Sequence, residues 1–143
     1  MIFTRGVIAF LLGFALVGLF QEAHGRDLGQ WGNTEPEVKA WFQALMQPDA
    51  PTRSCCGEAD AYWCDDVHVR DGRTFCKITD DRDDKPLKRP HIDIGTEIEV
   101  PPNKIKWDRG NPTGHTIIFL ASMAWNSSIY GRYVYCFVQS SGV

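Results

Sequence analysis

The chain has 143 residues, of which 43% are hydrophobic and 23% are charged, and its formal net charge is -3. This composition is that of an ordinary globular protein and excludes a disordered, collagen-like or polytopic membrane chain. The sequence offers no broad basic surface to neutralise phosphates, so nucleic acid is not an expected partner.

Residues 1–25 have the three parts of a secretory signal. A single early cation, Arg5, precedes an apolar stretch over residues 6–20, and small residues close the segment. The apolar stretch is shorter than the roughly 20 residues that a permanent membrane helix needs. We therefore expect cleavage after Gly25 and one mature domain over residues 26–143, periplasmic or secreted, with no permanent membrane span. An uncleaved amino-terminal anchor is the alternative.

The first element expected in the mature chain is a helix. It starts at residues 34–37, Thr-Glu-Pro-Glu, which form a capping-box pattern, and Pro48 and Pro51 stop it. Its apolar residues follow the spacing of one helix face: Val38, Trp41, Phe42, Leu45 and Met46. Such a stripe packs on a sheet far more often than it forms a ligand or membrane face, and we expect the packed helix.

A β-hairpin is expected over residues 61–79, around Asp71-Gly72. A type I′ turn needs positive φ at both central positions, which this dipeptide tolerates. With that turn, one strand face carries apolar residues and is assigned to the core: Val67, Val69, Cys76 and Ile78. The other face carries polar residues: His68, Arg70, Arg73 and Lys77.

An aspartate-rich segment, residues 79–86, follows the hairpin. Clustered carboxylates suggest calcium, but this segment lacks the glycine and the glutamate of an EF-hand loop, and Arg82 and Lys85 offset half of the charge. We therefore expect a solvated loop. Short antiparallel strands are predicted over residues 97–100 and 104–107.

Two strands complete the predicted fold. The continuous apolar run at residues 115–121 is typical of a central strand buried on both faces. A loop at residues 125–131 leads to a closing strand over residues 132–139, in which Val134, Cys136 and Val138 alternate with Tyr133, Tyr135 and Phe137. The fold class is therefore mostly β with one N-terminal helix: a small antiparallel sheet curled into a barrel or half-barrel, stabilised by disulfides.

The five cysteines indicate an oxidising compartment and allow two disulfides. Adjacent cysteines rarely bridge each other, and two further cysteines lie on expected core faces of strands. The disulfide candidates are Cys55, Cys56, Cys76 and Cys136. Cys64 falls on the opposite hairpin face from Cys76 and is the candidate odd thiol. A bulge at residues 65–66 would reverse that assignment and let Cys64 meet Cys76, so both pairings stay open.

The sequence offers little support for chemistry. The cysteine and histidine spacings provide no zinc-binding pair of pairs and no C-x-x-C motif, so neither a metal nor a cofactor is expected. The enzymatic alternative is a papain-like cysteine hydrolase acting on peptidoglycan. In that hypothesis Cys56 is the nucleophile at a helix start, His115 the base on a strand and Asn126 its orienting partner. The required helix would be only about two turns long and would compete with the hairpin.

A resemblance adds a location but no activity. The string at residues 54–62 with Val100-Pro101, residues 111–115 and Tyr135-Cys136-Phe137-Val138 resembles a group of short exported proteins of alphaproteobacteria, of rhizobial type. The likeness covers nearly the whole mature chain and implies a periplasmic or secreted protein. Many members of the group carry a cysteine where this chain has Ala61, and some lack Cys64 and Cys76. The resemblance thus implies that Cys64 and Cys76 form an added bridge, beside a shared one from Cys55 or Cys56 to Cys136.

The leading functional hypothesis is a non-enzymatic, disulfide-stabilised domain that binds an envelope protein or a small ligand. Irregular loops on a rigid sheet carry function more often than the sheet itself. The expected binding surface is therefore the segment over residues 107–115 together with one acidic residue before the hairpin. Its candidate residues are Asp60, Trp107, Asn111 and His115.

Overall fold

The computed structural model describes residues 32–122 and 132–140. The helices are α2 (Pro36–Ala44), α3 (Asp84–Leu87) and the 3-10 turn η1 (Pro102–Lys104). The strands are β1 (Met46–Gln47), β2 (Ala50–Ser54), β3 (Asp60–Trp63), β4 (Asp66–Arg70), β5 (Arg73–Lys77), β6 (Glu97–Val100), β7 (Ile105–Trp107), β8 (Ile117–Ser122) and β9 (Arg132–Gln139). The expected signal segment and the loop that carries Asn126 lie outside the described residues. Within those residues, no helix has the length and apolar character to cross a membrane.

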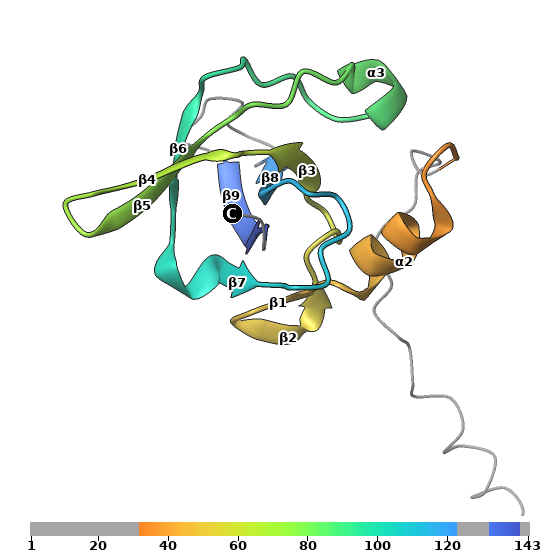
Figure 1. Ribbon diagram of the computed structural model, residues 1–143, viewed down its shortest axis with the longest axis horizontal. Coiled ribbons are helices and arrows are strands. Elements are labelled where there is room, and N and C mark those ends of the chain that lie inside the picture. The colour runs from red at the N-terminus through yellow and green to blue at the C-terminus, as the bar shows by residue number, and fades with distance from the viewer. Residues whose placement is uncertain (1–31, 123–131, 141–143) are drawn as a thin grey trace, which may run out of the picture.

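The described residues form three sheets, and the fold is mostly β as predicted (Figure 1). The central sheet has the strand order β3-β8-β9-β7, a second sheet has the order β4-β5-β6, and β1 pairs with β2. The described strands do not close into a barrel, so the predicted barrel or half-barrel is not confirmed. The chain leaves the central sheet after β3 and enters the second sheet at β4, and no strand pairing among the described residues joins the two sheets.

Strand β8 is buried on both faces, as predicted for a central strand. Ile118 and Leu120 point to one side, and Ile117 and Phe119 to the other. The first side is a hairpin-side cluster between the central sheet and the β4-β5-β6 sheet, formed mainly by Tyr62, Cys64, Cys76, Ile78, Ile92, Ile98, Val100, Ile118, Leu120, Val134 and Phe137. The second is a helix-side cluster under α2, formed mainly by Phe42, Leu45, Cys55, Cys56, Ala59, Ile117, Phe119, Ala121, Cys136 and Val138.

Helix α2 packs on the sheet through its predicted apolar stripe. The Phe42 ring meets the Phe119 ring of β8 edge to face, with centroids 6.0 Å apart. The predicted capping box is wrong, because the helix begins at Pro36 and its N-cap residue, Glu35, makes no side-chain capping bond. Proline at the first helical position has no N–H to satisfy and a φ already set for the helix.

The β4-β5 hairpin has the predicted register and turn. Asp71 and Gly72 adopt φ of 52° and 73°, and Val67 pairs with Cys76. The assignment of Val69 to the core is wrong, since this side chain is 69% exposed. Figure 1 shows the tip of the β4-β5 hairpin extending beyond the other strands.

Strand β9 departs from the simple alternation that was predicted. The register of β8 against β9 shifts between Phe119 and Leu120, where Cys136 and then Val134 are the partners. The extra residue turns Val134 into the hairpin-side cluster, while Cys136 stays in the helix-side cluster. Strand β7 pairs with β9 in parallel, so the antiparallel expectation for residues 104–107 is also wrong.

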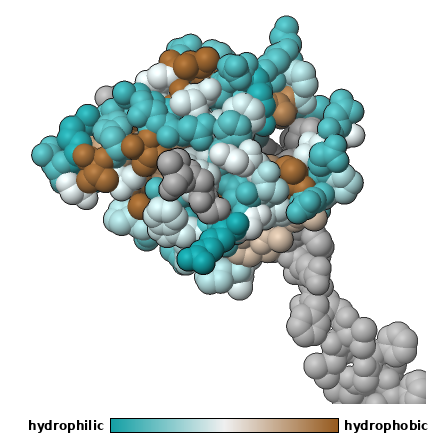
Figure 2. All heavy atoms as spheres, viewed as in Figure 1, coloured by the Kyte–Doolittle hydropathy of each residue, from teal (hydrophilic) through white to brown (hydrophobic). Residues whose placement is uncertain are grey.

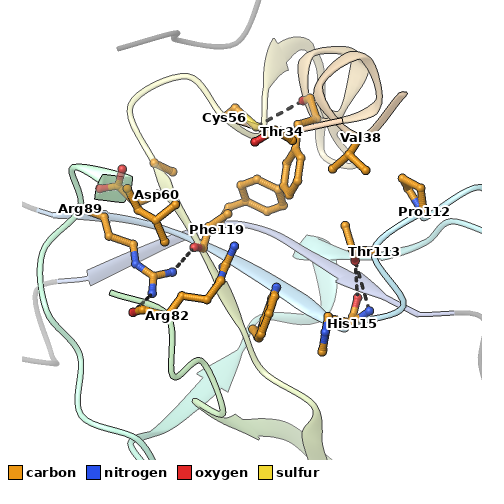
Figure 3. A pocket seen from close by; sticks show the side chains of 15 residues that line it. Thr34, Val38, Cys56, Asp60, Arg82, Arg89, Pro112, Thr113, His115 and Phe119 are labelled. Carbon is orange, nitrogen blue, oxygen red and sulfur yellow. Dashed lines mark hydrogen bonds between the residues drawn. The ribbon is translucent and has the colours of Figure 1, made fainter. Parts of the chain in front are cut away.

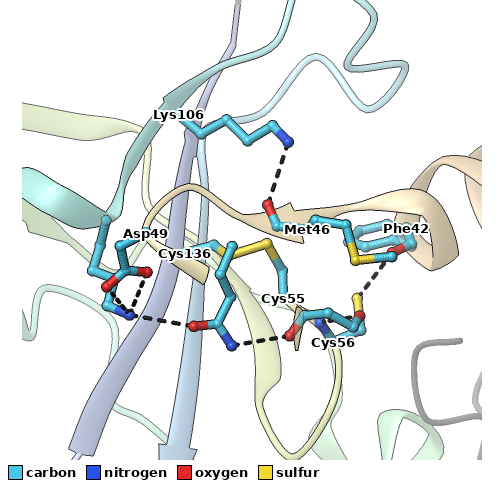
Figure 4. The surroundings of a disulfide bond; sticks show 10 residues. Phe42, Met46, Asp49, Cys55, Cys56, Lys106 and Cys136 are labelled. Carbon is cyan, nitrogen blue, oxygen red and sulfur yellow. Dashed lines mark hydrogen bonds and ion pairs between the residues drawn. A yellow bond between two sulfur atoms is a disulfide. The ribbon is translucent and has the colours of Figure 1, made fainter. Parts of the chain in front are cut away.

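Each cluster contains one disulfide. Cys55 is bonded to Cys136 in the helix-side cluster (Figure 4), and Cys64 is bonded to Cys76 in the hairpin-side cluster. Cys56 is the unpaired, buried thiol, so the choice of Cys64 as the odd cysteine and of Cys56 as a bridging candidate is wrong. Strand β3 ends at Trp63 and β4 starts at Asp66. This break between the two strands brings Cys64 to Cys76.

Candidate functional site

A cavity of about 370 Å³ opens between α2, β3, β8 and two loops (Figure 3). This volume lies at the lower end of the range of small-molecule sites. Its apolar lining comes from the helix-side cluster and its surroundings: Val38, Phe42, Ala59, Ala61, Trp63 and Phe119. The polar side chains of its lining include Asp60, Arg82, Arg89, Thr113 and His115. The cavity thus combines aromatic walls with a few convergent polar groups.

One wall of the cavity is a buried ion cluster from the loop after the hairpin. The Asp80 side chain is fully buried, and its carboxylate accepts bonds from Arg82 Nη2 at 2.6 Å and Arg89 Nη1 at 2.5 Å. Arg89, whose side chain is 3% exposed, also donates from Nε to Asp84 Oδ1 at 2.6 Å and from Nη1 to the Ala61 carbonyl at 2.8 Å. The expected solvated loop is therefore wrong for these residues.

The Asp80 carboxylate is ionised despite its burial. Burial by itself raises its pKa, but the hydrogen bonds from Arg82, from Arg89 and from the Trp63 amide outweigh burial and hold the pKa well below its usual range. A buried carboxylate with these donors fixes the guanidinium groups in place. The arginines that line the cavity are thus held in fixed positions.

Trp63, at the end of β3, links this wall to the opposite one. The Arg82 guanidinium carbon lies 4.1 Å from the centroid of the Trp63 ring, and the His115 imidazole stacks on Trp63 with centroids 3.8 Å apart. The Nδ1 atom of His115 lies 2.8 Å from Asp65 Oδ2. In Figure 3, Arg82 and Arg89 lie on one side of the cavity, and Thr113 and His115 on the other.

The structure brings together two of the four residues predicted to bind. Asp60 and His115 both line the cavity. Asn111 instead shapes the neighbouring turn: its Nδ2 donates to the His115 carbonyl at 2.8 Å, and its Oδ1 accepts from the Thr113 amide at 3.0 Å. Trp107 is 72% exposed at the end of β7, outside the cavity lining.

Cys56 also lines the cavity, but its surroundings do not suit a nucleophile. The thiol donates to the Phe42 carbonyl at 3.2 Å, and burial raises its pKa to about 12. Residues 57–59 form no helix and β3 follows them, so the predicted helix-start activation is wrong. In Figure 3, Cys56 and His115 lie at opposite ends of the cavity. The described residues contain no group of three or more metal-ligating side chains.

No local sequence pattern predicts the Asp80 cluster. Asp80, Asp81 and Asp83 stand in one polar run, and only Asp80 is buried. What distinguishes it is the contact with Arg89, nine residues later and beyond α3. A pairing of two arginines with one buried aspartate across such a loop is decided by tertiary packing.

Outside the cavity, the apolar side chains that the described surface exposes stand apart. They are Val69, Ile94, Trp107 and Tyr133. On the face in Figure 2, hydrophobic residues appear as separate patches among hydrophilic ones. Comparison of the chain with protein-family models, with curated proteins and with solved structures finds no match.

Proposed function

We propose that this protein is an exported, disulfide-stabilised binding domain whose cavity beneath α2 takes a small organic ligand. The observation that carries the proposal is the cavity itself, with aromatic walls and a wall of oriented guanidinium groups. Export is supported by the signal-like pattern of residues 1–25 and by two disulfides, which persist in oxidising compartments.

Binding fits the cavity better than catalysis. An activated cysteine needs a lowered pKa, whereas the Cys56 thiol has a raised one and donates its hydrogen to a carbonyl. The His115 imidazole contacts Asp65 and Trp63, and no described contact joins it to Cys56. The described cavity therefore contains no activated nucleophile of the papain type.

The shape of the cavity favours a ligand with an apolar body. The Val38, Ala61 and Trp63 side chains line the cavity and are only partly buried against the helix-side cluster. A ligand placed there covers apolar surface that is otherwise left in contact with water, and burial of apolar area is the general driving force for such binding.

The test uses a neutral apolar probe, 4-phenylbutan-1-ol, in an NMR titration of the isotope-labelled protein. We expect saturable shifts of amides around the cavity, such as those of Ala61 and His115. The cavity-filling variant Ala61→Phe should abolish them. The matched control Ala50→Phe adds the same ring on β2, away from the cavity, and should leave them unchanged.

A second filling variant, Val38→Trp, enters the cavity from α2 and guards against misfolding of Ala61→Phe. Wild-type protein that shows no saturable shifts with this probe or with 4-phenylbutyrate, the carboxylate of the same skeleton, would overturn the proposal. So would equal binding by the wild type and a folded filling variant. Export is tested by fractionation and by the mass of the mature chain, which should begin at residue 26.

A further inference from the structure

We infer that the ligand is an apolar carboxylate whose two oxygens are bound by Arg82, with Arg89 as the second donor. This inference rests on the proposed function and names the chemical class of ligand for the same cavity. Both guanidinium groups keep N–H hydrogens that have no acceptor among the described residues.

Arg82 uses only one edge of its guanidinium group within the protein. Its Nε and Nη2 atoms donate to the two Asp80 oxygens at 2.8 and 2.6 Å, in a side-on fork. A guanidinium has five N–H groups, so both Nη1 hydrogens and one on Nη2 have no acceptor among the described residues. One hydrogen on Nη1 and the remaining one on Nη2 form a second, end-on fork. The Arg82 side chain that carries this fork is 33% exposed and lines the cavity.

That second fork selects for a planar acceptor with two oxygens. Parallel N–H groups on Nη1 and Nη2 match the two oxygens of a carboxylate, which is the geometry of bidentate arginine recognition. An alcohol or a single carbonyl can accept only part of this fork. The two bonds to Asp80 and the contact with the Trp63 ring together restrain the guanidinium group, so the fork keeps its direction.

Arg89 provides a buried donor on the same wall. Its Nε and Nη1 hydrogens are taken by Asp84, Asp80 and the Ala61 carbonyl, and Nη2 donates once, to the Arg82 carbonyl at 3.3 Å. One Nη2 hydrogen of a side chain that is 97% buried thus has no acceptor within the described chain. Buried donors of this kind are normally satisfied, and a ligand oxygen in the cavity is a fitting partner.

Charge on this wall argues for recognition by hydrogen-bond geometry. Arg82 and Arg89 are offset by Asp80 and Asp84, so the cluster is formally neutral before a ligand arrives. Asp60 lies on the same side of the cavity in Figure 3 and opposes an incoming anion. The preference for a carboxylate therefore comes from the end-on fork of Arg82 and the remaining Nη2 hydrogen of Arg89, and removal of the Asp60 charge should strengthen it.

The test compares two probes of the same skeleton, 4-phenylbutyrate and 4-phenylbutan-1-ol, by NMR titration at pH 7. Charge-assisted hydrogen bonds are about twice as strong as neutral ones, so the wild type should bind the carboxylate at least about tenfold more tightly. Arg82→Gln should reduce this preference to less than about threefold without weakening binding of the alcohol. Asp60→Asn should tighten carboxylate binding about twofold to threefold.

Arg70→Gln is the matched control. Arg70 also pairs with a carboxylate, Glu97, and lies 4.2 Å from the centre of an aromatic ring, that of Phe75, but outside the cavity. It should leave both affinities unchanged. Arg82→Lys keeps the charge and removes the fork, so it should lose most of the carboxylate preference.

The outcomes separate the two claims. If the wild type binds both probes with equal affinity, the carboxylate inference is overturned and the proposed function stands. A folded Arg82→Gln variant that keeps the full preference also overturns the inference. If neither probe binds, the proposed function fails with it.

Discussion

The two faces of the central sheet differ in how they are covered. On the hairpin side, the β4-β5-β6 sheet lies over the central sheet, and a disulfide between residues 12 apart joins the two. On the helix side, α2 and loops cover the sheet, and the disulfide there joins residues 81 apart. The unpaired thiol and the cavity both belong to the helix side. The helix side of the sheet therefore contains both the longer-range disulfide and the cavity.

The size of the covering elements explains this difference. A helix of nine residues such as α2 is about 13 Å long and about 10 Å wide, so it covers only part of a four-stranded sheet. Loops from residues 80–89 and 112–115 border the rest, and loops pack less completely than a second sheet. The cavity forms where the helix and the loops meet, above Phe119.

The largest expected effect is the loss of the long-range disulfide. Replacing Cys55 and Cys136 by alanine removes a link across 81 residues, which the chain-entropy model values at about 4.5 kcal/mol. Replacing Cys64 and Cys76 removes a link across 12 residues, at about 3 kcal/mol. Urea unfolding measures both free energies. The order is contradicted if the 64–76 variant is the less stable of the two.

Cys56→Ala controls for the loss of a buried sulfur atom without loss of a bridge. It should cost about 1 kcal/mol. Alkylation of the unfolded, unreduced protein, followed by peptide mapping, should label Cys56 alone. Label on any other cysteine would mean that the pairing differs from the structure.

The next largest effect compares two phenylalanines on opposite faces of the sheet. Phe137 and Phe119 are both fully buried, but only Phe119 lines the cavity. Truncation of a fully packed ring leaves a larger new void, so Phe137→Ala should cost about 4 kcal/mol and Phe119→Ala about 3 kcal/mol. Denaturant unfolding provides the comparison. Equal costs would show that Phe119 is packed as fully as Phe137.

Asp80→Asn should cost about 3 kcal/mol, because it removes the more deeply buried of the two carboxylates that pair with Arg89. The lowered pKa of Asp80 also determines how the free energy of unfolding changes in acid. The contribution of Asp80 to stability is complete above the unfolded pKa of about 3.9 and is lost as the pH falls below it. The variant should therefore lose less stability than the wild type between pH 5 and pH 2.

Glu99→Gln is the exposed counterpart of that change, since Glu99 pairs with Arg73 on the surface. We expect a change within about 0.5 kcal/mol. Thermal unfolding over a pH series measures both variants. An exposed pair that costs as much as Asp80→Asn would show that burial of the Asp80 cluster is not what makes it stabilising.

The smallest effect is expected at the hairpin tip. Val69→Thr should change the free energy of unfolding by less than about 0.5 kcal/mol, because this side chain is 69% exposed. Val67→Thr, on the same strand but packed against the hairpin-side cluster, should cost about 1 kcal/mol. If both cost the same, the hairpin-side cluster extends to the tip.

The sequence by itself determined the elements whose signals are local. The Asp71-Gly72 turn, with positive φ at both residues, predicted the hairpin register. The 3.6-residue spacing from Val38 to Leu45 predicted the buried side of α2. The unbroken apolar run predicted β8 as a central strand. Each of these signals involves residues that are neighbours in the chain, so the local sequence is sufficient to predict the element.

Only the tertiary structure decided the disulfide pairing, the sheet arrangement and the cavity. The pairing of Cys64 depends on where β3 ends, and the side taken by Val134 depends on one extra residue in β9. The burial of Asp80 depends on Arg89, which follows α3. Such choices depend on contacts between residues distant in sequence, and a shift of one residue reverses the face of a strand. Local pattern therefore predicts which segments form strands, and long-range packing decides what those strands enclose.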